Sequence, residues 1–376
     1  MNAALNSSVE IRKGLEGVIV DSTTVSDVDG EAGRLYYRGY KVESLIKHTF
    51  ADAAHLIVFG ELPNAARRKE FEEFLSQAGA LPAFIANLIV QLAKTDAHPM
   101  EILQAVAPLL AHEPPANSLG RTADEAQGLL VAARLPTAIA LTLATRQNRP
   151  FAYSPVPRYG ERYLHMLTGK QPDAIAVAVF EQTQILQLDH SFNASTFTAR
   201  VITSTLAPMA CALAGALGAL YGPLHGRADQ AALEMAEEVA EPTNAHRYVS
   251  DCIAKKKLVM GMGHREYRVV DPRAKVIKQL AEQIATRPEH RRLFDTLIAV
   301  EKEFVDQTAA RSRSLRANLE FYKGVVYLSL GIPKDYFTAS FAAARIFGWL
   351  THVVEQKQDN RIIRPAAHYI GPAPRE

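Results

Sequence analysis

The sequence predicts a mostly α-helical protein with one small β-hairpin near its N-terminus. Side chains that favour strands, β-branched and aromatic residues around an Asp-Gly pair, are concentrated in residues 17–40. Beyond them, apolar segments of helical length occupy residues 172–188, 209–221 and 335–356. Several of these segments are apolar on all sides, which indicates helices buried in a large helical assembly or at a subunit interface.

The composition is that of a globular protein and narrows the class of function. A chain of 376 residues predicts two domains, or one large domain with an insertion. The 42 Lys and Arg against 40 Asp and Glu leave a net charge of +2, which argues against a protein that coats nucleic acid or anionic lipid. The two cysteines, Cys211 and Cys252, match no disulfide framework and no metal spacing, which favours a reducing, cytoplasmic compartment.

No targeting or membrane segment is predicted. The longest apolar run noted, residues 209–221, has 13 residues, short of the roughly 20 that a spanning helix needs. The start of the chain has no apolar core and one Arg-Lys pair, so neither a signal peptide nor a transit peptide is expected. The hairpin follows soon afterwards, which leaves little expected room for a regulatory domain before it.

Two helices have recognisable starts. Thr122 and Glu125 form a T-x-x-E capping box, and the helix that follows is expected to break near Pro136. Asp271 precedes a proline, which predicts a second helix start because Asp is a favoured N-cap and Pro a favoured first residue. Arg273 then lies in the first turn, against the helix dipole. Two interpretations stay open: a pair with a neighbouring carboxylate, or a site for an anion.

Three histidines and a further arginine occupy unusual places. His190, His225 and His264 lie near helix ends, 35 and 39 residues apart, and they lack the i, i+4 spacing of a helical metal pair, so no metal site is expected. Arg345 interrupts an apolar segment and lies within about 40° of Phe341 on a helical wheel, so it is expected to be buried and to need an anionic partner. A structural salt bridge is the default expectation for it.

Six segments, in this order and spacing, resemble the citrate synthase family: LDHSFNAST, GPLHG, GHREYRVVDPR, NLEFYKG, FAAARIFGW and IIRP. With DGEAGRLYYRGY near the start, the resemblance covers nearly the whole chain. It implies a two-domain helical fold. Residues 1–225 and 326–376 would form a large domain for dimerisation and oxaloacetate, and residues 226–325 a small domain that binds CoA and closes over it.

The family reaction, a step of the tricarboxylic acid cycle, is an acyl transfer that joins acetyl-CoA to oxaloacetate and releases citrate and CoA. The resemblance implies acetyl-CoA as co-substrate, no further cofactor, no nucleic acid or membrane partner, and a homodimer whose higher assembly is left open. By resemblance, oxaloacetate is bound by His190, Arg273, Arg345 and, from the partner subunit, Arg364. The catalytic residues implied are the enol donor His225, His264 on the ketone, and Glu320. The CoA contacts implied are Met260, Gly261, Met262, Gly263 and Arg268.

The chain departs from the family pattern around the base. Glu320 stands where the family has aspartate, and its extra methylene moves the carboxylate by about 1.5 Å, whereas a shift on the order of 1 Å can cost about 10²-fold in rate. Lys323 replaces a small residue and Asp229 a common asparagine. Further departures are Arg227, Met262 and Glu266.

Three hypotheses follow from this pattern. The first is an active citrate synthase with Glu320 as base. The second is a 2-methylcitrate synthase that uses propionyl-CoA, which differs by one methyl group and hence by only about 1–3 kcal/mol of discrimination. The third is a catalytically weakened paralogue with a role in binding or assembly.

Overall fold

The computed structural model describes residues 11–113, 118–264, 266–309 and 315–372. Within these ranges the chain forms 16 α-helices and one three-stranded sheet, so the mostly helical prediction is confirmed. The prediction of no signal or transit peptide falls mostly on residues 1–10, and these lie outside the described residues.

The helices before the middle of the chain are α1 (Val42–Leu45), α2 (Phe50–Phe59), α3 (Ala65–Ala78), α4 (Ala83–Ala93), α5 (Pro99–Val106), α6 (Ala123–Arg146), α7 (Tyr159–Thr168) and α8 (Ala174–Ile185). Those after it are α9 (Ala194–Ser204), α10 (Met209–Tyr221), α11 (Ala228–Val239), α12 (Ala245–Ala254), α13 (Pro272–Ile284), α14 (Pro288–Gln307), α15 (Leu319–Ser329) and α16 (Phe337–Gln358).

The predicted hairpin is present and supports a loop of the candidate site. Strands β1 (Ser26–Asp29) and β2 (Arg34–Tyr37) pair antiparallel, and β3 (Tyr40–Lys41) adds a short third strand. The turn between β1 and β2 touches the loop that precedes α13, where the Arg268 N–H donates to the Gly30 carbonyl at 2.9 Å. A side chain at Gly30 would collide with the Glu266 carbonyl, so the close approach needs glycine.

Helix α6 runs without a break through Pro136, so the predicted break is wrong. Proline removes a backbone donor, but α6 packs against α4, α7, α10 and α16, and this burial offsets the local cost. By length and composition α6 also qualifies as a membrane span, which the prediction of no membrane segment did not consider. Since 94% of its most apolar window is buried inside the protein, α6 has the burial of a core helix.

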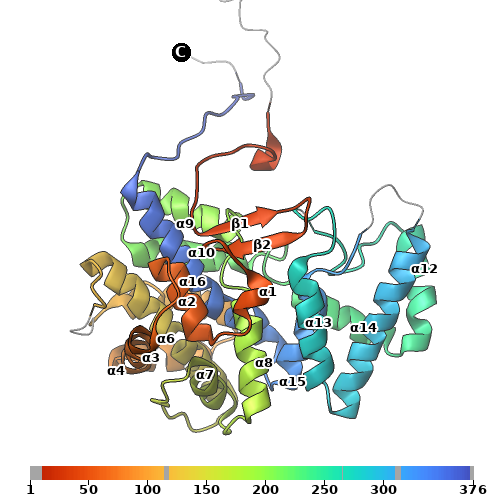
Figure 1. Ribbon diagram of the computed structural model, residues 1–376, viewed down its shortest axis with the longest axis horizontal. Coiled ribbons are helices and arrows are strands. Elements are labelled where there is room, and N and C mark those ends of the chain that lie inside the picture. The colour runs from red at the N-terminus through yellow and green to blue at the C-terminus, as the bar shows by residue number, and fades with distance from the viewer. Residues whose placement is uncertain (1–10, 114–117, 265, 310–314, 373–376) are drawn as a thin grey trace, which may run out of the picture.

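Two groups of helices meet at α15. Helices α11, α13 and α14 all pack against α15, and Figure 1 shows this group on one side of the molecule. Helices α6, α9 and α10 pack against α16 on the other side. Because α15 also contacts α8, it carries residues of the first group towards the segment that follows α8.

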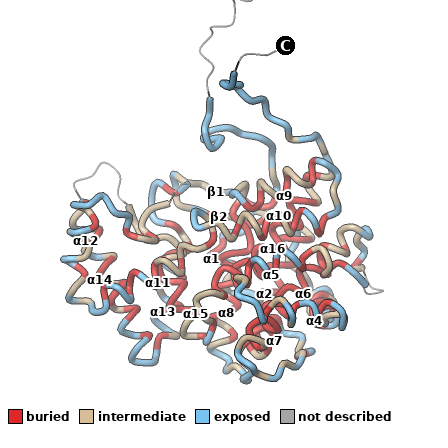
Figure 2. The backbone as a smooth tube through the Cα atoms, turned by 180° about the vertical axis from the view of Figure 1, so that it is seen from behind, coloured by how far each residue is buried: buried red, intermediate tan, exposed pale blue. Residues whose placement is uncertain are grey.

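Both ends of the described chain leave the body. Residues 11–24 and 359–372 extend from the same side of the molecule in Figure 1, and Figure 2 shows them as largely exposed. The C-terminal segment exposes large apolar side chains, with Ile362 59%, Tyr369 74% and Ile370 87% exposed. We call residues 359–372 the C-terminal arm.

Candidate active site

The start of α13 holds an arginine through its own N-cap. Asp271 accepts a hydrogen bond from the Arg273 backbone N–H at 3.0 Å, and its two carboxylate oxygens accept from Nε at 3.0 Å and Nη2 at 2.9 Å. Burial alone would lower the pKa of Arg273, but the Asp271 carboxylate raises it. The predicted cap and a carboxylate partner are therefore both confirmed, and Arg273 is a rigid, buried cation.

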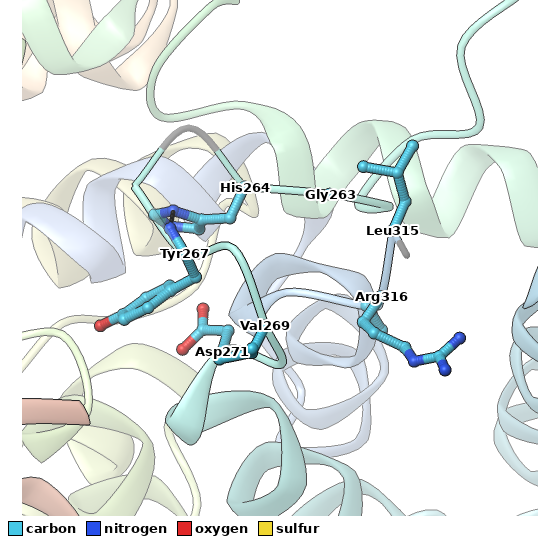
Figure 3. A pocket seen from close by; sticks show the side chains of 8 residues that line it. Gly263, His264, Tyr267, Val269, Asp271, Leu315 and Arg316 are labelled. Carbon is cyan, nitrogen blue, oxygen red and sulfur yellow. Dashed lines mark hydrogen bonds between the residues drawn. The ribbon is translucent and has the colours of Figure 1, made fainter. Parts of the chain in front are cut away.

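His264 faces Arg273 from the loop before α13. Its Nδ1 accepts hydrogen bonds from the backbone N–H groups of Glu266 at 3.0 Å and Tyr267 at 3.3 Å, so the neutral ring carries its proton on Nε2. That nitrogen lies 3.5 Å from Arg273 Nη2. Two donors that face each other suit a shared acceptor, such as a carbonyl or carboxylate oxygen. Figure 3 shows the small pocket between His264, Tyr267 and Asp271, from which the Arg316 side chain points away.

His190 completes this side of the site. It is buried, its Nε2 lies 3.1 Å from the Tyr267 hydroxyl, and its ring centre is 5.3 Å from that of His264. Burial lowers its pKa well below the usual value, and the neighbouring cations Arg273 and Arg345 lower it further. The ring is therefore neutral at physiological pH and can hydrogen-bond a ligand without adding charge.

Arg345 lies on α16 with 2% of its surface exposed. Its Nε donates to the Gln187 carbonyl at 2.6 Å, and its guanidinium stands 4.7 Å from the centre of the Phe341 ring, as the helical wheel predicts. Burial lowers its pKa, and Asp189 offsets this only in part. No carboxylate among the described residues lies within 4.0 Å of it, so the expected structural salt bridge is not found there. A buried cation that lacks a carboxylate at ion-pairing distance favours an anionic ligand.

His225 is oriented by the start of α9. Its Nε2 faces the Ser195 backbone N–H at 3.4 Å and the Ser195 Oγ at 2.8 Å, and Trp349 of α16 donates to that Oγ at 3.1 Å. Because the Ser195 backbone N–H donates to Nε2, the proton of the neutral ring is on Nδ1. Burial lowers the pKa of His225 to about 4, with contributions from Arg345 and Lys323.

We expect His225 to stay neutral, as a hydrogen-bond donor, down to acidic pH. Because its pKa in the folded protein is about 4, the ring should take up a proton only as the pH falls through that value. A histidine NMR titration of the whole protein, with His225→Asn used to assign the resonance, measures this directly. A midpoint near 6.5, the value of an unperturbed histidine, would contradict the burial of His225 beside Arg345 and Lys323.

The carboxylate of Glu320 lies in a buried ion cluster at the start of α15. Glu320 pairs with Lys323 of the same helix at 2.5 Å. Lys323 is fully buried, lies 3.3 Å from the Asp229 carboxylate of α11 and donates to Gln187 Oε1 at 2.9 Å. Three positions that depart from the family pattern are thus linked through the Lys323 ammonium. We call Asp229, Lys323 and Glu320 the buried triad.

The loop predicted to hold CoA is joined to the segment that carries Glu320. Gly263 donates its N–H to the Arg316 carbonyl at 2.7 Å, and Asn318 donates to the Gly261 carbonyl at 3.0 Å. Met262 pairs with Ala317 in an isolated bridge. Gly261 and Gly263 have φ angles of 77° and 94°, which glycine adopts without strain. One short backbone pairing therefore fixes His264 relative to Glu320.

The two remaining predicted arginines lie at the surface of the chain. Arg268, the predicted phosphate contact, is 57% exposed in its side chain and forms an ion pair with Glu31 of the hairpin turn at 3.4 Å. Arg364 is exposed on the C-terminal arm. The structure thus gathers His190, His264 and Arg273, with Arg345 and His225 nearby, but places Arg364 on a segment that leaves the body of its own chain.

Comparisons with known proteins decide the family. Residues 14–366 match the family model described as "Citrate synthase, C-terminal domain". The chain is 38% identical over 378 residues to a citrate synthase of Synechocystis, covering 99% of this chain and 94% of the relative. The chain belongs to the citrate synthase family, whose enzymes are acyltransferases.

Two further comparisons give the family's range. A 2-methylcitrate synthase of Shewanella oneidensis is 35% identical, with 96% of each chain covered. The citrate synthase of Thermoplasma acidophilum, solved as a ternary complex with carboxymethyl coenzyme A and oxaloacetate, superposes with a TM-score of 0.90 at 30% identity and 98% coverage of each chain.

Several residues that shape this citrate synthase family site were missed in the sequence. Tyr267 joins His190 to the His264 loop, and Ser195 sets the tautomer of His225. Ser195 lies two residues after the α9 cap Asn193, whose Oδ1 is 2.7 Å from the Ser195 Oγ, so its proximity to a cap was a readable signal. No group of three or more His, Cys, Asp or Glu with metal-binding geometry occurs among the described residues.

Proposed function

We propose that this chain is a citrate synthase that condenses acetyl-CoA with oxaloacetate and then hydrolyses the citryl thioester. The observation that carries the proposal is the placement of Arg345, a buried guanidinium without a carboxylate partner among the described residues, near Arg273 and the neutral His190. Such a site suits a small dicarboxylate. The carboxylate of Glu320 supplies the base that the reaction needs.

The proposed chemistry assigns one step to each group. Glu320 removes a proton from the thioester methyl group, and His225 donates a hydrogen bond from Nδ1 to the enolate oxygen that forms. His264 Nε2–H polarises the ketone of oxaloacetate. The enol carbon then attacks the ketone carbon, and a C–C bond forms as the ketone oxygen gains a proton. Water finally cleaves the thioester, which releases citrate and the CoA thiol.

The CoA assignments and the domain motion belong to this proposal. Residues 260–263 would hold CoA through their backbone, and Arg268 would exchange Glu31 for a phosphate. Residues 226–325 would act as the small domain that closes and excludes water before the enol forms. We propose no metal and no cofactor besides acetyl-CoA, and a cytoplasmic location.

The acyl group is tested by comparing two thioesters. CoA-thiol release is measured with oxaloacetate and either acetyl-CoA or propionyl-CoA. For a citrate synthase, kcat/KM should be higher with acetyl-CoA, within the roughly 10- to 200-fold range that one methyl group supports. The reverse preference would make this a 2-methylcitrate synthase, the activity named for the Shewanella relative. Release with neither thioester would favour the weakened paralogue with a role in binding or assembly.

We also propose a homodimer in which Arg364 completes the site of the partner subunit. The exposed apolar side chains of the C-terminal arm support this, because a second chain would cover them.

A mixing experiment tests the shared site. Glu320→Gln and Arg364→Leu are each expected to be nearly inactive. When the two are unfolded and refolded together, one site of each mixed dimer has both residues intact, so about a quarter of all sites should be active. Mixed samples that show only the summed activity of the separate variants would contradict a site shared across the interface.

A further inference from the structure

The buried triad brings together charged residues of two helices inside the proposed active site. Lys323 has no exposed surface, and Asp229 is also fully buried, whereas the side chain of Glu320 is 15% exposed. A buried ammonium is costly unless carboxylates and hydrogen bonds compensate it. Here the compensation comes from Glu320 at 2.5 Å, Asp229 at 3.3 Å and the amide oxygen of Gln187 at 2.9 Å.

The net charge of the buried triad suits a general base. With all three groups ionised, two carboxylates and one ammonium give a net charge of −1, the charge of a lone carboxylate. The Lys323 ammonium pairs with two carboxylates, so Glu320 alone does not neutralise its charge. Removing either Lys323 or Asp229 changes this net charge by one unit, while removing both together restores it.

We propose that Lys323 is a positioning residue that holds the Glu320 carboxylate in place for proton abstraction, and that Asp229 offsets the charge of Lys323 so that the triad keeps the net charge of a lone carboxylate. The inference rests on the proposed function, in which Glu320 is the base. Lys323 acts through Glu320 and through the field that it exerts on the site, and it takes no part in bond making.

The surroundings of the triad are compatible with this role. The Lys323 ammonium lies 4.2 Å from the centre of the Phe341 ring, the same ring that Arg345 contacts. Burial raises the pKa of Asp229 to about 6, although Lys323 opposes the shift. The nearby titratable groups are His225, whose pKa Lys323 helps to lower, and Tyr327, whose hydroxyl accepts from Gln187.

Other charges also lie around α15, and the Asp271 carboxylate accepts from the Leu319 N–H at its start at 3.2 Å. Lys278 of α13 and Glu301 of α14 pair at 2.6 Å and hold Tyr322, the residue before Lys323. Arg345 of α16 and Arg273 at the start of α13 are cations that also lie close to the site. Lys278→Met therefore serves as a matched control, because it removes a lysine from an ion pair beside α15 without touching the triad.

The test is the pH profile of kcat for CoA release, measured for wild type, Lys323→Met, Asp229→Asn and the double variant. Met keeps the length of the side chain and avoids a large cavity. In Lys323→Met two carboxylates face each other without a cation, so the acidic limb should move up by about one pH unit or more. In Asp229→Asn the acidic limb should move to lower pH and the plateau value of kcat should fall, because Lys323 then pairs with Glu320 alone.

The double variant decides the matter. It restores the net charge, so its acidic limb should return towards that of wild type, and Lys278→Met should leave the limb unchanged. A Lys323→Met limb at the wild-type pH, or a double variant no closer to wild type than Lys323→Met, would overturn the proposal.

A second readout separates this proposal from the proposed function. Urea unfolding of the same variants at pH 5 and pH 8 needs no turnover. Lys323→Met should lose stability as the pH rises, since its facing carboxylates have raised pKa values in the folded state, and the double variant should lose less. If wild type releases no CoA, the proposed function fails, and equal pH dependence of unfolding in all variants would then overturn the triad as well.

Discussion

Replacing Arg345 with methionine should lower kcat/KM for oxaloacetate by about 30- to 5,000-fold, because truncating one side of a buried charge pair costs about 2–5 kcal/mol. The same change should leave the fold intact. The guanidinium is buried with no carboxylate within ion-pairing distance among the described residues, so its removal relieves a desolvation cost. The hydrogen bond to the Gln187 carbonyl and the contact of the guanidinium with the Phe341 ring are lost in return.

Arg345→Lys is the matched control for charge. Lysine keeps the positive charge but lacks the planar fork that binds a carboxylate through two hydrogen bonds, so its kcat/KM should lie between those of wild type and Arg345→Met. Steady-state kinetics with varied oxaloacetate concentration give kcat/KM, and urea unfolding gives the free energy of unfolding. A marked loss of stability in Arg345→Met with unchanged kinetics would show that Arg345 is structural.

The sequence predicted those features that are set by short stretches of chain. The N-cap Asp271, the capping box at Thr122 and the burial of Arg345 beside Phe341 each depend on residues close in sequence, and all three are confirmed. The break at Pro136 was wrong because packing around α6 outweighs the local preference of proline.

The site required tertiary information. The sequence marked Asp229 and Lys323 as departures, yet nothing in it showed that they touch, because α11 and α15 are joined by three intervening helices. The tautomers of His225 and His264 likewise depend on backbone donors of other segments or of the local loop. The roles of these residues stay predictions, which the variants above address.

Glu320→Gln should reduce CoA release by about 10²- to 10⁴-fold, the range that a general base contributes. Gln has nearly the shape of Glu, and Lys323 keeps Asp229 as an ionic partner, so oxaloacetate affinity and the fold should be retained. Glu320→Asp should also lose activity, because the shorter side chain withdraws the carboxylate by about 1.5 Å from a position that Lys323 fixes.

The most direct test of the account is CoA-thiol release from acetyl-CoA and oxaloacetate by wild type, Glu320→Asp and Glu320→Gln at one pH. We predict that wild type turns over, that Asp is slower and that Gln is nearly inactive while it still binds oxaloacetate. A silent wild type that Glu320→Asp activates would contradict Glu320 as a working base and would identify a weakened member of the family.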